Sequence, residues 1–195
     1  LDTLDALGWE RFAVLGHSMG AGIGSILAAS LPQRVERLVA IEALGALSET
    51  PQRTTLRLRE SVAAMRALPG KKLRVFPDLS APIRARMQAN QLSEASARLL
   101  VERGVVATDA GYIWSSDPRL TLPTMTRMTA VQVENLVTGI SCPATVIFGY
   151  PAQHYLQDDL RSTRAALLPH GDLVLMPGRH HLHLLQPALI ARVIV

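Results

Sequence analysis

The sequence predicts an α/β fold in which a parallel sheet is interrupted by a long helical insertion. Four short apolar runs, at 11–15, 37–41, 144–148 and 172–176, are typical of buried strands. Helical segments follow the first and third runs, and a strand, a helix and a strand at that spacing form a right-handed crossover in a parallel sheet. The segment 47–140 has helix signals and few strand signals, which indicates an insertion between two halves of one sheet.

The two halves of the sheet are expected to consist of short alternating elements. The chain begins with the end of an amphipathic helix closed by Gly8, and a helix of small residues follows the first strand. In chain order, the expected elements are a helix end at 1–8, a strand at 11–15, a helix at 21–29, a strand at 37–41, a strand at 144–148, a helix at 156–168, a strand at 172–176 and a helix at 187–195.

The insertion at 47–140 is predicted to be helical. Helices are expected at 51–68 and 93–103, each followed by a glycine, and Thr129 with Gln132 forms a capping box that opens a third. An insertion between sheet strands is typical of a cap over the carboxyl ends of the strands, where α/β folds place their sites. Four side chains are candidates either to line the underside of this cap or to pack its own core: Tyr112, Trp114, Met125 and Met128.

The composition excludes several classes of function. Hydrophobic residues make up 48% of the chain and charged residues 18%, a balance typical of globular domains. No window approaches the roughly 18 continuous apolar residues of a transmembrane segment, so none is expected. The formal charge of +4 comes from arginines spread along 53–127 without a dense basic block, which predicts no nucleic-acid site. The single cysteine, Cys142, excludes an internal disulfide and is expected to be a small buried residue.

The motif Gly-His-Ser-Met-Gly at 16–20 is the strongest indication of function. It joins the first strand directly to the small-residue helix, where a strained turn exposes a serine oxygen and only glycine fits at Gly16 and Gly20. The backbone N–H of Met19 would face the oxyanion created by attack of Ser18, and the helix dipole would help it. Ser18 is therefore the candidate nucleophile, the alternative being an ordinary serine in a tight turn.

A serine nucleophile needs a base, and the loop after the strand at 172–176 holds three of the chain's six histidines: His180, His181 and His183. Simple packing or hydrogen bonding is an alternative role for each of them. A His-His-x-His cluster could also supply metal ligands. No Asp, Glu or Cys lies nearby in the sequence to complete such a site, so no metal is expected.

The carboxylate that orients the base is expected at the end of a neighbouring strand. Glu42 directly follows the strand at 37–41, so it emerges at the same sheet edge as Ser18. Its neighbours are apolar, which a carboxylate without a partner would avoid. The competing candidates, Asp158 and Asp159, lie in a helix that is expected to be solvated, and we favour Glu42.

These residues resemble the α/β-hydrolase superfamily. The resemblance rests on the motif around Ser18 and on Gly-Arg-His-His-Leu-His-Leu at 178–184, and the stretch from Trp114 to Pro143 resembles the serine hydrolase-like proteins, a capped branch of that superfamily. The likeness covers nearly the whole chain. It implies that Ser18 is the nucleophile and that His180 is the base.

The chain departs from the commonest pattern of the superfamily at two positions. Ala152 stands where many members carry the acid, whereas haloalkane dehalogenases and some relatives use an acid at the position of Glu42. A serine at the nucleophile position disfavours dehalogenase or epoxide hydrolase chemistry. Arg179 stands where a small residue is usual, which bears on the geometry of the histidine loop.

The resemblance implies a carboxylic-ester hydrolase that works through an acyl-enzyme on Ser18, without a cofactor, on a small-molecule substrate with a hydrolysable acyl group. Residues 1–46 and 141–195 would be the carboxyl-terminal part of an α/β-hydrolase core that lacks its first strands, and 47–140 the helical cap. Two alternatives stay open. One is a non-catalytic binding protein of the same fold, and the other is a metal-dependent hydrolase that uses His180, His181 and His183.

The resemblance also bears on the 195 residues taken alone. The loop that normally gives the second oxyanion donor would precede the strand at 11–15, and that strand would become an unpaired apolar edge. We therefore expect these residues alone to be poorly active and prone to association. The expected location is cytoplasmic, and because the sequence begins without methionine, a signal peptide upstream of residue 1 stays open.

Overall fold

The computed structural model describes residues 1–70, 74–152 and 157–194. The chain divides into two compact units. We call residues Leu1–Pro51 and Arg127–Val195 the sheet unit, and Gln52–Thr126 the insert unit. The insert unit begins five residues after the expected start at 47 and ends 14 residues before the expected end at 140. The second boundary differs more because the helix at 130–138 packs with the sheet unit.

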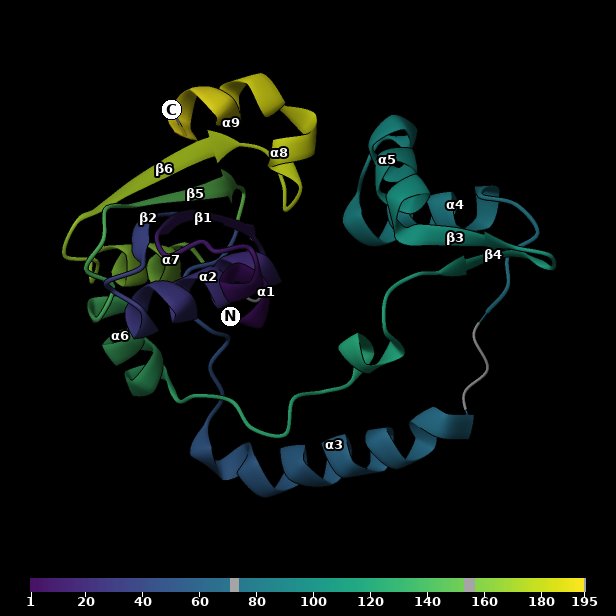
Figure 1. Ribbon diagram of the computed structural model, residues 1–195, viewed down its shortest axis with the longest axis horizontal. Helices are drawn as coiled ribbons and strands as arrows, with labels where there is room; N and C mark the ends of the chain where they lie inside the picture. The colour runs from purple at the N-terminus through teal and green to yellow at the C-terminus, as the bar shows by residue number, and fades with distance from the viewer. Residues whose placement is uncertain (71–73, 153–156, 195) are drawn as a thin grey trace. The chain divides into compact units, whose positions relative to one another are not determined.

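The sheet unit is built on four parallel strands in the order β1-β2-β5-β6 (Figure 1). Their bounds are Phe12–His17 for β1, Val35–Ile41 for β2, Ala144–Tyr150 for β5 and Gly171–Pro177 for β6. The parallel sheet expected from the apolar runs is therefore confirmed. Within the described part of the chain, β1 pairs only with β2, so it forms one edge of the sheet, and Leu15 on it is 57% exposed.

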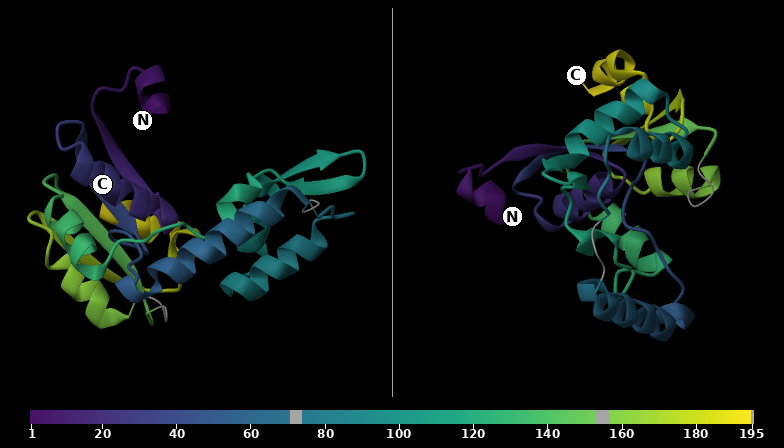
Figure 2. Two further views of the ribbon diagram at one scale, coloured as in Figure 1. Left: turned by 90° about the horizontal axis from the view of Figure 1, so that it is seen from below. Right: turned by 90° about the vertical axis from the view of Figure 1, so that its right-hand side faces the viewer.

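Helices cover both faces of this sheet (Figure 2). The helix bounds are Asp2–Ala6 for α1, Met19–Ser30 for α2, Ala130–Thr138 for α6, Asp158–Ala165 for α7, Leu182–Leu185 for α8 and Pro187–Ile194 for α9. The expected helix start at 156 and the expected last residue of the final helix, 195, lie outside the described residues. No helix among those described is both long and apolar enough to cross a membrane.

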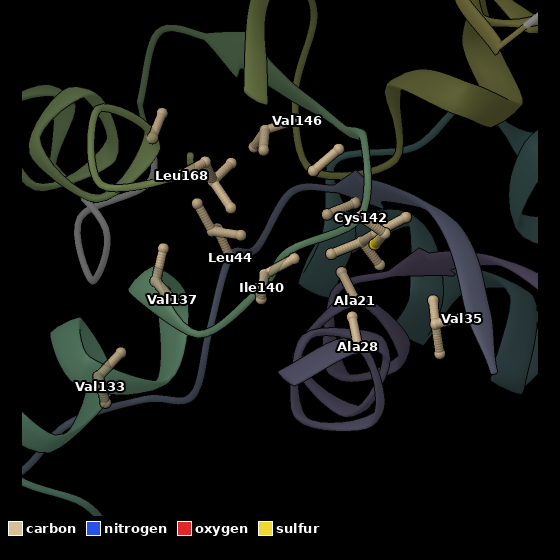
Figure 3. Close-up of a cluster of buried hydrophobic side chains, with 14 of the residues drawn as sticks. Ala21, Ala28, Val35, Leu44, Val133, Val137, Ile140, Cys142, Val146 and Leu168 are labelled. Atoms are coloured by element: carbon tan, nitrogen blue, oxygen red, sulfur yellow. The ribbon is translucent and has the colours of Figure 1, made fainter. Parts of the chain in front are cut away.

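The alternation of side chains along β2 explains why helices lie on both faces. Successive strand residues point to opposite faces. Leu38 and Ala40 join a core with α2, α6 and the end of α7, whereas Val39 and Ile41 join a second core with α8 and α9. Because both faces are buried over its second half, residues 38–41 of the strand form a continuous apolar run. Figure 3 shows the first core, with labelled side chains Ala21, Ala28, Val35, Leu44, Val133, Val137, Ile140, Cys142, Val146 and Leu168.

Two local features fix α2 and α6 against this core. A Cβ at Gly24 of α2 would lie 2.9 Å from Cγ1 of Val14, so the glycine lets the helix approach β1 closely. The capping box predicted for α6 is present, because the Thr129 side chain accepts from the Gln132 backbone and the Gln132 side chain accepts from the Thr129 backbone. Cys142 is buried, as the sequence indicated.

The insert unit contains helices and a hairpin. Its elements are η1 (Pro51–Arg53, which begins at the boundary), α3 (Thr54–Ala67), η2 (Leu68–Gly70), α4 (Ser80–Asn90), α5 (Glu94–Gly104), β3 (Val105–Thr108), β4 (Gly111–Trp114) and η3 (Pro118–Thr121). The helices at 51–68 and 93–103 were predicted, but α4 and the antiparallel β3–β4 hairpin were not. Four-residue strands give too short a pattern to stand out in the sequence.

Two of the four candidate cap side chains pack within their own units. Trp114 lies against the small core of the insert unit and makes an edge contact with Phe76, at 6.3 Å between ring centroids. Met128 packs against the first core of the sheet unit. Tyr112 is half-buried on β4, and Met125 is 44% exposed. Trp114 therefore packs the core of its own insertion, the second of the two roles considered, whereas Met128 has neither role, because it belongs to the sheet unit and packs against its core.

Candidate active site

Ser18 lies between β1 and α2 in a strained conformation. Its φ of 54° and ψ of −116° fall outside the regions that non-glycine residues ordinarily adopt. The Ser18 N–H donates to the Ile41 carbonyl at 2.8 Å, which fixes the turn against the end of β2. A Cβ at Gly16 would lie 2.3 Å from the Gly20 carbonyl oxygen, so glycine is required there. The same prediction for Gly20 is wrong, because a Cβ at Gly20 would meet no described atom within 4 Å.

Met19 is the first residue of the 12-residue helix α2. The first N–H groups of a helix have no partner inside it and carry the positive end of its dipole. The Met19 side chain is 65% exposed. Its backbone N–H is therefore a donor of the kind that the sequence analysis proposed for an oxyanion.

Glu42 directly follows β2 and is 2% exposed. It has a positive φ of 61°, so Ser18 and Glu42 are two of the three described non-glycine residues with this strained backbone. One carboxylate oxygen, Oε1, accepts from the Gly149 N–H at 2.6 Å, and the other, Oε2, lies 3.3 Å from Nδ1 of His180. The structure thus joins the sequence-predicted acid to the sequence-predicted base.

The pKa of Glu42 is set by opposing effects. Burial alone would raise it, but the hydrogen bonds from His180 and from the Gly149 backbone, together with the nearby charge of Arg161, outweigh burial. The net pKa of the Glu42 carboxyl lies below its ordinary value. Glu42 is therefore a carboxylate at neutral pH, the form that can accept a hydrogen bond from an imidazole N–H.

Two buried arginines of α7 hold the segment that contains Glu42. Arg161 donates from Nη1 to the Gly149 carbonyl at 2.6 Å, its Nη2 lies 3.6 Å from Glu42 Oε2, and its guanidinium stacks 4.6 Å from the Phe148 ring centroid. Arg164 donates to the carbonyl oxygens of Leu44 and Ala46, at 3.2 Å each. The segment that begins at Glu42 is thus held by α7, the helix that follows β5.

Sequence reasoning missed both arginines. Helix α7 was expected to be solvated because it is rich in charged residues. Asp158 and Asp159, the competing acids, are exposed at its N-terminus, and Asp158 lies 3.9 Å from Arg161. The available signal was that Arg161 and Arg164 stand three residues apart, and so share one face of a helix that has few apolar residues to bury.

His180 reaches Glu42 from the loop after β6. Gly178, with a φ of 147°, turns the chain, and a Cβ at Gly149 would lie 2.5 Å from the Gly178 carbonyl oxygen. The loop and the end of β5 therefore touch backbone to backbone. Arg179 is exposed, so the unusual residue at this position leaves the contact between His180 and Glu42 in place.

His17, which the sequence analysis treated only as part of the motif, links Ser18 to the histidine loop. Its Nε2 lies 2.6 Å from the His180 carbonyl oxygen, and the His17 and His180 rings are 4.7 Å apart between centroids. Burial lowers the pKa of His17 to about 4, with the neighbouring histidines adding to this shift and the bond to the His180 carbonyl opposing it. The residue beside the candidate nucleophile is thus packed directly on the candidate base.

The three candidate residues lie at the carboxyl ends of the strands, where different contacts fix Ser18 on the one hand and the pair of Glu42 and His180 on the other. Glu42 and His180 are hydrogen-bonded to each other. The Ser18 backbone is hydrogen-bonded to Ile41, which precedes Glu42, and Ser18 follows His17, which contacts His180. The hydrogen bonds of the described residues include none between the Ser18 hydroxyl and the His180 ring. Such bonds are often long in unliganded sites and tighten when substrate binds.

The histidines suited to metal binding differ from those of the metal-dependent alternative. One ring nitrogen each of His17, His181 and His183 lie within 4.8 Å of one another. The sequence analysis had considered His180, His181 and His183. His180 is instead engaged with Glu42, and His17 comes from β1 to take its place in the group. Burial lowers the pKa of His183, and the charge of His180 adds to this effect.

Comparison with known proteins places the fold. A family model described as the alpha/beta hydrolase fold matches residues 2–126. A serine hydrolase-like protein of Dictyostelium discoideum is 30% identical over 197 residues, which cover 94% of this chain and 54% of that protein. The chain thus spans about half the length of that curated relative.

Solved structures agree with this match. A hypothetical protein from Pseudomonas aeruginosa PAO1 has a TM-score of 0.89 and 35% identity, over 98% of this chain and 69% of that one. A thioesterase domain from the curacin biosynthetic pathway has a TM-score of 0.73 and 20% identity, over 100% of this chain and 70% of that one, a likeness of fold alone.

Proposed function

Because the chain belongs to the alpha/beta hydrolase fold family, we propose that it is a serine hydrolase that cleaves carboxylic esters through an acyl-enzyme on Ser18. The observation that carries this proposal is the hydrogen bond between the buried Glu42 and His180, beside a serine held in a strained turn. The resemblance to serine hydrolase-like proteins noted from the sequence agrees with the curated relatives.

The proposed reaction has two steps. In the first, His180 takes the proton from the Ser18 hydroxyl while the Ser18 oxygen attacks the acyl carbon. His180 then passes that proton to the departing alcohol. In the second, His180 takes a proton from water, which attacks the acyl-enzyme and releases the acid, and the proton returns to Ser18. Glu42 holds the Nδ1 proton of His180 and stabilises the imidazolium that forms in both steps.

The negative charge of each tetrahedral intermediate needs a donor. We assign this role to the Met19 backbone N–H at the positive end of α2. The resemblance assigns a second donor to a loop outside residues 1–195, which makes it part of the proposal for the whole protein. The substrate is a small molecule with a hydrolysable acyl group, and the insert unit, Gln52–Thr126, is proposed as the cap that selects it.

The test is hydrolysis of a panel of short-chain esters, thioesters and lactones by the intact native protein, measured with and without a chelator. We expect ester turnover that the chelator leaves intact and that Ser18→Ala abolishes. Chelator-sensitive turnover restored by zinc would favour the metal-dependent alternative. A folded protein that turns over nothing in the panel and is not acylated would favour the non-catalytic binding protein.

A further inference from the structure

We propose that His17, His181 and His183 form a binding site for a divalent transition-metal cation of the zinc type. Their ring centroids lie 5.1 Å apart for His17 and His181, 4.2 Å for His17 and His183, and 5.8 Å for His181 and His183. One nitrogen of each ring lies within 4.8 Å of the others. The end of β1 supplies His17, His181 directly precedes α8, and His183 lies within α8.

The hydrogen bond of His17 prepares that ring to act as a ligand. A carbonyl oxygen can only accept, so Nε2 of His17, at 2.6 Å from the His180 carbonyl, carries the ring proton. Nδ1 of His17 then keeps its lone pair for a metal. Histidines that bind metals almost always donate their other ring N–H to a carboxylate, a backbone carbonyl or water, and His17 has such a partner.

His183 gives a second, independent indication. Its Nδ1 is buried and has no hydrogen-bond partner in the part of the chain that the structure describes. Buried polar atoms are nearly always satisfied, so one that is not calls for a partner that the protein itself does not supply. A cation held jointly with the other two rings would relieve this cost.

The donor set selects the class of cation. Three imidazoles suit zinc, copper and nickel, whereas magnesium and calcium prefer oxygen ligands. A zinc–nitrogen bond of about 2.05 Å at a tetrahedral centre places its nitrogens about 3.3 Å apart, so the rings must draw together by side-chain rotation. All three side chains are only partly buried, which leaves room for water as a fourth ligand.

The site is separate from the catalytic proposal. It uses neither Ser18 nor Glu42 nor the ring of His180, so cation binding does not depend on whether the serine acts as a nucleophile. A bound cation would tie the histidine loop to the end of β1. Because a ligand that binds only the folded state stabilises it, zinc should raise the melting temperature.

The experiment is calorimetric titration of zinc chloride into the protein as its cell makes it, free of any polyhistidine tag and stripped with a chelator. We expect one zinc per chain and a rise in melting temperature, and no response to magnesium or calcium. His17→Gln, His181→Gln and His183→Gln should each weaken binding at least about 10- to 100-fold, the loss that follows removal of an outer-shell partner. Ser18→Ala should bind zinc as well as the parent.

The matched control is His170→Gln, because His170 is exposed and lies before β6, outside the cluster. Binding should be unchanged in this variant. X-ray absorption of zinc on the unmodified protein covers the case in which a cluster variant fails to fold, and should show imidazole nitrogens at about 2.0 Å. Absence of binding, a shell of oxygen ligands alone, or equal affinity in all three folded cluster variants would overturn the proposal.

Discussion

The sheet unit and the insert unit differ in how they use their apolar residues. The sheet unit buries them in two cores on either side of four strands. The described residues of the insert unit form one small core, of Ile83, Leu92, Ala97 and Val101. In its helix α3 the buried residues are Arg57 and Ser61, while four large apolar residues are more than a third exposed, namely Leu56, Leu58, Val62 and Met65.

This difference separates two demands on the chain. A catalytic group has to be held in place by packing and hydrogen bonds, and the sheet unit holds Glu42 by three such contacts, one each from Gly149, Arg161 and His180. The ion pairs given by the described residues of the insert unit are instead exposed, as is that of Arg98 with Glu94. Equivalent substitutions in the two units should therefore have very different effects.

The largest difference is expected between two carboxylates. Glu42→Gln removes the group that orients His180 and should lower turnover about 10⁴-fold. Asp117→Asn in the insert unit removes a carboxylate that also accepts hydrogen bonds, from Arg119, but is solvated, and should stay within a few-fold of the parent. Ester hydrolysis at saturating substrate measures both variants.

The same assay ranks the competing acids. Asp158→Asn and Asp159→Asn should also stay within a few-fold, since both side chains are exposed on α7. A large loss in either of them, with Glu42→Gln nearly normal, would move the acid to the position that is commoner in the superfamily.

The second contrast concerns two arginines. Arg161→Met leaves the buried Glu42 without one of its partners and should cost about 3–5 kcal/mol in the free energy of unfolding. Arg98→Met in the insert unit breaks exposed pairs with Glu94 and Glu102, and should cost less than about 1 kcal/mol. Urea denaturation measures both costs, and similar values would remove the distinction between the units.

The third contrast concerns leucines. Leu38→Ala on β2 should destabilise the protein by about 2–5 kcal/mol, because the side chain is fully buried and its loss leaves a cavity. Leu58→Ala on α3, where the side chain is 38% exposed, should cost less than about 1 kcal/mol. If Leu58→Ala cost as much as Leu38→Ala, the side chain of Leu58 would be buried in the folded protein.

The smallest contrast lies in acid stability. The folded-state pKa of Glu42 is below the ordinary 4.5, so Glu42 contributes stability above pH 4.5 that is lost as the pH falls through its folded-state pKa. Hydrogen bonds from Arg119 lower the pKa of Asp117 to about 2, but solvent screens this fully exposed group. Glu42→Gln should therefore flatten the stability curve below pH 4.5, whereas Asp117→Asn should barely change it. Denaturation followed between pH 2 and 6 measures both effects. A larger change in the pH dependence of the free energy of unfolding for Asp117→Asn than for Glu42→Gln would contradict this expectation.

The sequence predicted the sheet unit better than the insert unit for a physical reason. Residues 38–41 of β2 and 146–148 of β5 are buried apolar runs, and the turn at Ser18 requires Gly16, so both features leave clear patterns. The β3–β4 hairpin is half exposed and short, and its pattern is weak. Tertiary contacts leave little local pattern: the three-residue spacing of Arg161 and Arg164 was the one sign of their burial, and the approach of His17 to the histidine loop left none.

The most direct test of the central claim is labelling of the protein as its cell makes it with a fluorophosphonate, followed by mass spectrometry of its peptides. The account predicts one adduct, on Ser18, which forms far more slowly in Glu42→Gln. Ser25 and Ser61 are buried and Ser115 is exposed in the insert unit, so they serve as internal controls. An adduct on one of these three serines, or an active preparation with no adduct on Ser18, would contradict it.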